Sequence, residues 1–120
     1  MAVIRFEELE CWQKAKNVAV RVYEVSNDGE FGRDFGLRDQ VRRAAVSIAS
    51  NIAEGKERGT VPEFIRYLHM ARGSAGELKT QLIIAVEIGY LDRERFKDLR
   101  QDVHHLSAMI GALIKTLRAR

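Results

Sequence analysis

The clearest periodic stretch of the sequence is residues 93–117, RERFKDLRQDVHHLSAMIGALIKTL. Its large apolar residues alternate spacings of three and four without interruption: Phe96, Leu99, Val103, Leu106, Ile110, Leu113 and Leu117. That spacing places them on one side of an α-helix, in the heptad pattern by which neighbouring helices of a bundle pack. The stretch therefore predicts a long amphipathic helix that other helices must cover.

Three earlier segments show helical periodicity, and short breaks separate them. The break at residues 27–29 is Asn-Asp-Gly, Gly59 suits a left-handed helix end, and residues 60–63 match a capping box with Pro62 in the first turn. We expect Phe31, Phe35 and Leu37, in or near the first connection, to cover one end of the core. Because short connections favour antiparallel neighbours, we expect an all-α protein, an antiparallel up-down-up-down four-helix bundle. The expected helices of this single domain of residues 1–120 are about 8–26, 34–57, 61–88 and 93–117.

The composition excludes several classes of protein. The chain has 120 residues, 46% of them hydrophobic and 31% charged, with one Pro and one Cys. This length suits one domain, and the single Cys11 excludes an internal disulfide and a multi-cysteine metal site. No stretch reaches the roughly 18 apolar residues of a membrane helix, and the acidic start (Glu7, Glu8 and Glu10) is unlike a signal peptide. We therefore expect a cytoplasmic protein with no membrane contact.

The sequence lacks the motifs of common catalytic sites. A di-iron bundle needs two Glu-x-x-His motifs, whereas this chain has only the related spacing of Asp102 and His105. The glycines at 73 and 76 lie inside a helical period, whereas a phosphate-binding loop follows a strand and opens a helix. No paired acid and base or activated nucleophile is evident. We therefore expect a protein that is not an enzyme, with no catalytic residue, cofactor, metal or small-molecule substrate.

Small residues gather at two places on the expected helices. Gly73, Ala75 and Gly76 are close together in the third helix, and close approach of another helix would explain glycines at these positions. In the second helix Ala45, Ala49 and Ala53 recur every four residues beside the stripe of large residues. This second face could meet a helix of the same chain or of a partner subunit. Alternatively, the alanines simply favour helix formation.

The positive charge is concentrated in the middle of the chain. The net charge is +3, and residues 32–79 hold nine Lys or Arg against six Asp or Glu. Cations can contact the phosphates of nucleic acid, although the alternative is an ordinary solvated surface. No aromatic residues alternate with the cations, so sequence-specific RNA recognition is not indicated. The candidate nucleic-acid-binding residues are Arg38, Arg42, Arg43, Lys56, Arg58, Arg66, Arg72 and Lys79.

Residues 42–55, RRAAVSIASNIAEG, followed by Arg58, strongly resemble the signature of the 23S rRNA intervening-sequence proteins, which are small bacterial four-helix-bundle proteins. Two departures from the family pattern are visible. Ala49 stands where the family often has Pro, which should leave the second helix straighter, and Ala75 replaces a larger apolar residue. Further matches are Phe6-x-x-Leu9-x-x-Trp12, Gly36-Leu37, Gln40, Ala71-x-Gly73-Ser74, Glu77-Leu78 and Gly89-Tyr90-Leu91.

The resemblance implies a ring-like homopentamer. It also connects the chain to the accessory proteins of diversity-generating retroelements, which form basic pentameric barrels and work with a reverse transcriptase and nucleic acid. RNA or DNA, a reverse transcriptase and further copies of the chain are therefore the expected partners. Five subunits of charge +3 would carry about +15, and a ring concentrates such a field. The alternative is an adaptor that binds proteins and no nucleic acid.

Several matched polar residues share helix faces and form the last candidate set. Ser47, Asn51 and Glu54 are spaced by four and three residues in the second helix. Buried polar groups need partners, and a network of them can fix the register between helices. We expect a polar network between helices or subunits made of Arg43, Ser47, Asn51, Glu54, Ser74 and Glu77.

Overall fold

Four long helices make up most of the computed structural model, which describes residues 4–120. They are α1 (Glu10–Val25), α3 (Phe35–Glu57), α4 (Val61–Glu87) and α5 (Arg93–Arg118). Two short elements accompany them, the 3₁₀ helix η1 (Phe6–Glu8) and the single-turn helix α2 (Gly29–Arg33). Residues 4–120 contain no strand, so the all-α prediction is confirmed.

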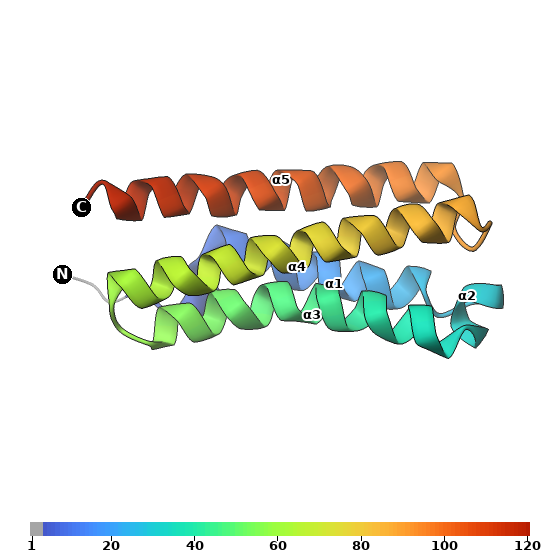
Figure 1. The fold of residues 1–120 in the computed structure, drawn as a ribbon, viewed down its shortest axis with the longest axis horizontal. Coiled ribbons are helices and arrows are strands. Elements are labelled where there is room, and N and C mark those ends of the chain that lie inside the picture. Colours follow the sequence, from blue (N-terminus) through green and yellow to red (C-terminus); the bar gives the residue numbers. More distant parts are fainter. Residues whose placement is uncertain (1–3) are drawn as a thin grey trace.

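The four long helices lie side by side in an elongated bundle, 49 × 20 × 20 Å (Figure 1). Each runs antiparallel to the next along the chain, in the order α1, α3, α4, α5. α3 packs against α1 and α4, and α5 packs against α4 and α1, which closes the bundle. The predicted up-down-up-down four-helix bundle is therefore confirmed.

Side-chain caps and turn glycines set the helix ends. Asp34, Thr60 and Asp92 each accept a hydrogen bond from the backbone N–H three residues later, which satisfies a free donor at the first turn. Gly59 and Gly89 have φ of +84° and +85°, a conformation that other residues adopt only with strain. These local signals end each helix sharply and keep the connections short.

The apolar stripes meet along the bundle axis. The stripe of α5 buries Leu99, Val103, Leu106, Ile110 and Leu117 as expected, but Ile114 is buried where Leu113 is only half-buried. The covered face is wider than a heptad seam because α5 contacts both α4 and α1.

The first connection differs from expectation. Phe31, on the short helix α2, is 1% exposed and covers the end of the core, and its ring lies 5.7 Å from that of Tyr90. Phe35 is 62% exposed, so its predicted place in the core is wrong. The reason is that α3 begins at Phe35 and turns this first residue outward, while Leu37 is half-buried.

Candidate nucleic-acid interface

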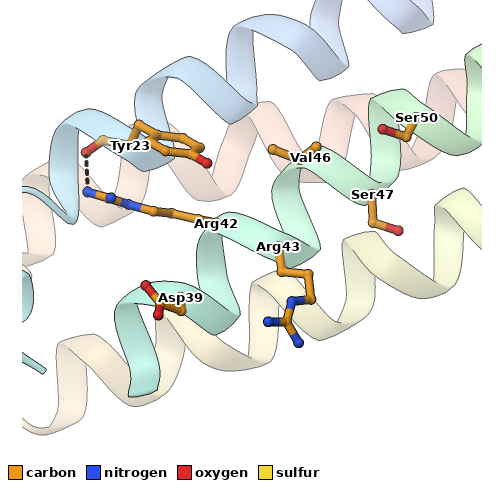
Figure 2. A pocket seen from close by; sticks show the side chains of 7 residues that line it. All are labelled: Tyr23, Asp39, Arg42, Arg43, Val46, Ser47 and Ser50. Carbon is orange, nitrogen blue, oxygen red and sulfur yellow. Dashed lines mark hydrogen bonds between the residues drawn. The ribbon is translucent and has the colours of Figure 1, made fainter. Parts of the chain in front are cut away.

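A hollow between α1 and α3 contains two of the predicted cations, Arg42 and Arg43 (Figure 2). Arg42 donates to the buried Ser26 hydroxyl at 2.9 Å, and its guanidinium lies 4.5 Å from the centre of the Tyr23 ring. Arg42 therefore ties α3 to the end of α1 through neutral partners. The hollow is about 590 Å³ in volume and is lined by Tyr23, Asp39, Arg42, Arg43, Val46, Ser47 and Ser50.

This hollow holds charges of both signs. Arg38 pairs with Asp39, with 3.1 Å between Nε and Oδ1, and it also donates to the backbone oxygen of Gly32. Arg43 points in a different direction from Arg42 (Figure 2) and has no hydrogen bond or ion pair within residues 4–120. A polyanion would meet the Asp39 carboxylate here beside Arg42 and Arg43, whereas a lining without acidic residues suits phosphates better.

Two more predicted cations are compensated at the α3–α4 connection. Arg58 donates to Glu54 at 3.0 Å and to the Tyr67 hydroxyl at 2.7 Å, and Arg66 donates to Glu63 at 2.8 Å. The hydrogen bond to Glu54 raises the pKa of Arg58, and the hydrogen bond from Arg66 lowers the pKa of Glu63. Both guanidiniums also lie over the Tyr67 ring, at 5.2 and 4.7 Å. These charges stabilise the connection between α3 and α4.

Unpaired cations gather instead in a groove between α4 and α5. Two adjoining hollows of about 410 and 510 Å³ share Lys79 and His104, and we call them together the α4–α5 groove. Within residues 4–120, none of the residues that line the α4–α5 groove is acidic. The lining comprises Arg72, Gly73, Ala75, Gly76, Lys79, Lys97, Arg100, Gln101, Val103, His104 and Ser107.

Helical spacing explains how these side chains come together. Arg72 and Lys79 are seven residues apart on α4, and Lys97, Arg100 and His104 are spaced by three and four on α5. Such spacings put side chains on one face of a helix, and here the two faces border each other. The four Lys and Arg side chains have no ion pair within residues 4–120.

α5 carries acidic charge on its other side. Asp102 faces α1, where Lys14 Nζ lies 2.9 Å from Asp102 Oδ1 and Arg21 pairs with Asp102 Oδ2. These groups are only about one-third exposed, so their attraction is less screened than that of a fully solvated pair. The helix thus presents an anionic side to α1 and a cationic side to α4.

The floor of the α4–α5 groove is open because two of its residues are glycines. A Cβ built on Gly73 or Gly76 would meet no atom within 4 Å outside its own helix backbone. The expected close approach of another helix is therefore not made to these two glycines within residues 4–120, although Ala75 is buried. Glycine in a helix interior costs up to about 1 kcal/mol relative to Ala, and bundle packing gives no reason for that cost here.

The close approach within the chain occurs at Gly55 on α3. A Cβ there would lie 2.6 Å from the Tyr67 Cβ and 3.2 Å from Phe64 Cδ1 on α4. Beside it, Ala45 is fully buried, while Ala49 and Ala53 are half-buried. The predicted small-residue face of this helix is therefore partly used inside the bundle, and α3 is unbroken through Ala49.

The structure brings together only part of the predicted cation set. Arg72 and Lys79 lie in the α4–α5 groove, whereas the other six lie outside it, and Lys56 is half-buried. The predicted set lacks Lys97, Arg100 and His104. It was chosen from the excess of charge in each segment, and that count does not show which side chains share a helix face. The spacing of these three residues along the last helix was the available signal.

The predicted polar network is also partly assembled. The Ser47 and Ser74 hydroxyls are 2.9 Å apart, and Asn51 Nδ2 donates to the Ser47 hydroxyl at 3.0 Å and to its backbone oxygen at 2.9 Å. Glu54 belongs to a separate cluster with Arg58 and Tyr67. In the described part of the chain, neither Arg43 nor Glu77 hydrogen-bonds to the serine and asparagine group.

Residues 4–120 give little support to other kinds of site. They contain no group of three potential metal-ligating side chains, and none of their helices has both the length and the apolar character needed to cross a bilayer. Cys11 is 5% exposed, and burial raises the pKa of its thiol to about 11. A protonated thiol is a poor nucleophile, so Cys11 acts as a packed core residue.

Comparison with known proteins adds the family. A family model described as 23S rRNA-intervening sequence protein matches residues 7–112. The chain belongs to this family. No curated protein matches this family member. A solved structure of a protein of unknown function from the S23 ribosomal protein family of Bacteroides thetaiotaomicron is similar, with a TM-score of 0.81 and 24% identity over 88% of this chain and 98% of that one. This likeness shows the shared fold.

Proposed function

We propose that this 23S rRNA-intervening sequence family member is a non-enzymatic, cytoplasmic, ring-shaped homopentamer that binds RNA or DNA through a basic surface. The α4–α5 groove is the observation that supports the binding role. Its Lys and Arg side chains have no carboxylate partner within residues 4–120, so their charge remains available to phosphates. Elsewhere Arg38, Arg58 and Arg66 are paired with acids.

The proposal of a ring draws on the family analogy and on apolar surface outside the core. Isolated exposed apolar residues are ordinary, but several on neighbouring helices suit a subunit contact. Five copies would bring five basic grooves to one particle and a net charge of about +15. The exposed apolar side chains on α3, on α4 and directly after α4, each at least 40% accessible, are Phe35, Val46, Met70, Ile83, Ile84 and Ile88.

Two measurements test this proposal. Native mass spectrometry should give five times the 13.7 kDa chain mass. A fluorescein-labelled 20-nucleotide RNA should be retained at about 50 mM salt, with an affinity that falls linearly on a log–log plot as salt rises. No retention at that salt would refute the nucleic-acid role and favour an adaptor that binds proteins. A reverse transcriptase, suggested by the retroelement analogy, is best tested afterwards by co-purification with the RNA-loaded ring.

A further inference from the structure

We propose that the α4–α5 groove holds one nucleic-acid strand by its consecutive phosphates, without reading the bases. This inference rests on the proposed nucleic-acid function and assigns its site. The phosphate contacts are Arg72, Lys79, Lys97 and Arg100, and His104 lines both hollows. Gly73 and Gly76 provide the clearance that lets the strand approach the helix backbone.

The spacing of the cations suits a run of phosphates. From Arg72 to Lys79 the helix rises about 10 Å, and from Lys97 to Arg100 it rises about 5 Å, at about 1.5 Å per residue. The two rows lie on antiparallel neighbours and follow one another along the groove: Arg72 lines the first hollow, Lys97 and Arg100 line the second, and Lys79 lines both. At about 3.4 Å per phosphate along a helical strand, the row on α4 alone covers about three phosphates.

The floor of the groove supports the same occupant. Gly73 and Gly76 line the first hollow beside Arg72 and Lys79, and nothing in the bundle fills the space where their side chains would be. Glycine is suited to sites where a ligand must approach the main chain closely. Ala would fit at both positions and would favour the helix, so the clearance serves something outside the bundle.

The chemistry of the lining indicates recognition of the backbone. No aromatic side chain lines either hollow of the described structure, so bases have no stacking partner there. Lys and Arg contacts to phosphates fix the position of a strand but carry no sequence information. A helix from a second copy is the competing occupant. It would have to bring enough acidic groups to offset four Lys or Arg charges, whereas a phosphate run supplies them directly.

The first test removes charge at the groove and at a matched control surface. The groove variant is Lys79→Gln/Lys97→Gln/Arg100→Gln, and the control is Lys16→Gln/Arg33→Gln/Arg95→Gln, with three exposed cations away from the groove. Both lose the same net charge. Fluorescence anisotropy with the 20-nucleotide RNA between 50 and 200 mM salt should show at least about a tenfold loss for the groove variant at 50 mM. Its log–log salt slope should fall by about 2, at about 0.7 per lost contact, while the control keeps the wild-type slope.

The second test fills the floor without changing charge. Gly76→Leu should weaken RNA binding about tenfold with the oligomer mass unchanged, while Asn17→Leu, which adds Leu to an exposed face of α1, should bind like the wild type. Poly(A) and poly(U) of equal length should bind within about threefold of each other if bases are not read.

The outcomes separate the two proposals. If the wild type binds RNA but the groove and control triple variants behave alike, the groove assignment is wrong and the nucleic-acid role stands. If Gly76→Leu lowers the oligomer mass and leaves RNA affinity intact, a second copy occupies the groove and this inference is overturned. A strong preference for one homopolymer would overturn backbone-only recognition. If the wild type itself binds no RNA, the proposed function fails.

Discussion

The Ser47 hydroxyl of α3 lies 2.9 Å from the Ser74 hydroxyl of α4, and this pair joins the two helices near their midpoints. Both side chains are half-buried, and Asn51 completes the group by donating to the Ser47 hydroxyl. If the two helices slid past one another, the hydrogen bond between the two hydroxyls would break. The group therefore specifies the register of α3 against α4, beyond what apolar packing requires.

Replacing Ser74 with Ala should lower the free energy of unfolding by about 1 kcal/mol, since the Ser47 hydroxyl loses its partner across the helix interface. Urea denaturation followed by circular dichroism measures this change. Ser50→Ala, at an exposed position of α3, is the control and should stay within about 0.5 kcal/mol of the wild type.

Asn51→Leu probes the same group from the other side, because it removes two hydrogen bonds to Ser47. Light scattering should report a smaller particle, or denaturation a less stable one. A particle of unchanged mass and unchanged stability would argue against any structural role for these polar residues.

Alanine substitution should destabilise the protein at one glycine and stabilise it at two others. Gly55→Ala should destabilise the protein by about 1–3 kcal/mol, because its Cβ would collide with the Tyr67 Cβ on α4. Gly73→Ala and Gly76→Ala should each stabilise it by about 0.5–1 kcal/mol, because a methyl group meets only open space there. Thermal unfolding of the three single variants distinguishes the two cases. A stabilised Gly55→Ala, or a destabilised Gly76→Ala, would contradict the packing described above.

Cys11 should make the stability of the protein fall at alkaline pH. Burial raises the pKa of its thiol from 9.0 to about 11, so the folded state holds this proton more tightly than the unfolded state. The stabilisation is complete below pH 9 and is lost as the pH rises toward 11, by up to about 2 kcal/mol. Urea denaturation at pH 8 and pH 10.5 should show a larger loss for the wild type than for Cys11→Ala.

The Cys11→Ala variant serves as the control for other titrating groups. Tyr90, whose pKa is raised by its hydrogen bond to the Asp34 carboxylate, titrates in both proteins and cancels in the comparison. Equal losses in the two proteins would exclude Cys11 as the source. A thiol reagent such as DTNB should also react slowly with native Cys11 at pH 8 and rapidly after unfolding.

The fold was predictable because its determinants are local in the sequence. The periodicity of residues 93–117 identifies α5 without knowledge of its neighbours, and the Thr60 cap and Gly59 mark the start of α4 and the end of α3. Phe35 was misplaced because its exposure depends on which way the first turn of α3 faces. That direction is set by the short helix α2, whose single turn has little periodicity to detect.

The candidate site was less predictable because it depends on which charged side chains lie close together in the fold, and not on how many each segment of the sequence holds. Arg42 and Arg58 looked available in the sequence, yet Arg42 binds Ser26, 16 residues away, and Arg58 binds Tyr67, nine residues away. Lys97 and Arg100 gain their importance only because α5 lies beside α4. A count of charges along the chain does not show which faces of α4 and α5 lie side by side.

The contact between α1 and α5 has a consequence for how the chain folds. Within residues 4–120, the other neighbouring long helices follow one another in the chain, but Asp102 meets Lys14 and Arg21 across 88 and 81 residues. Closing so large a loop costs more entropy than forming a helical hairpin, so we expect this seam to close last. A nascent chain leaving the ribosome would then hold α1 with one flank uncovered until α5 had also been made. The first of the four long helices is thus sealed by the fourth.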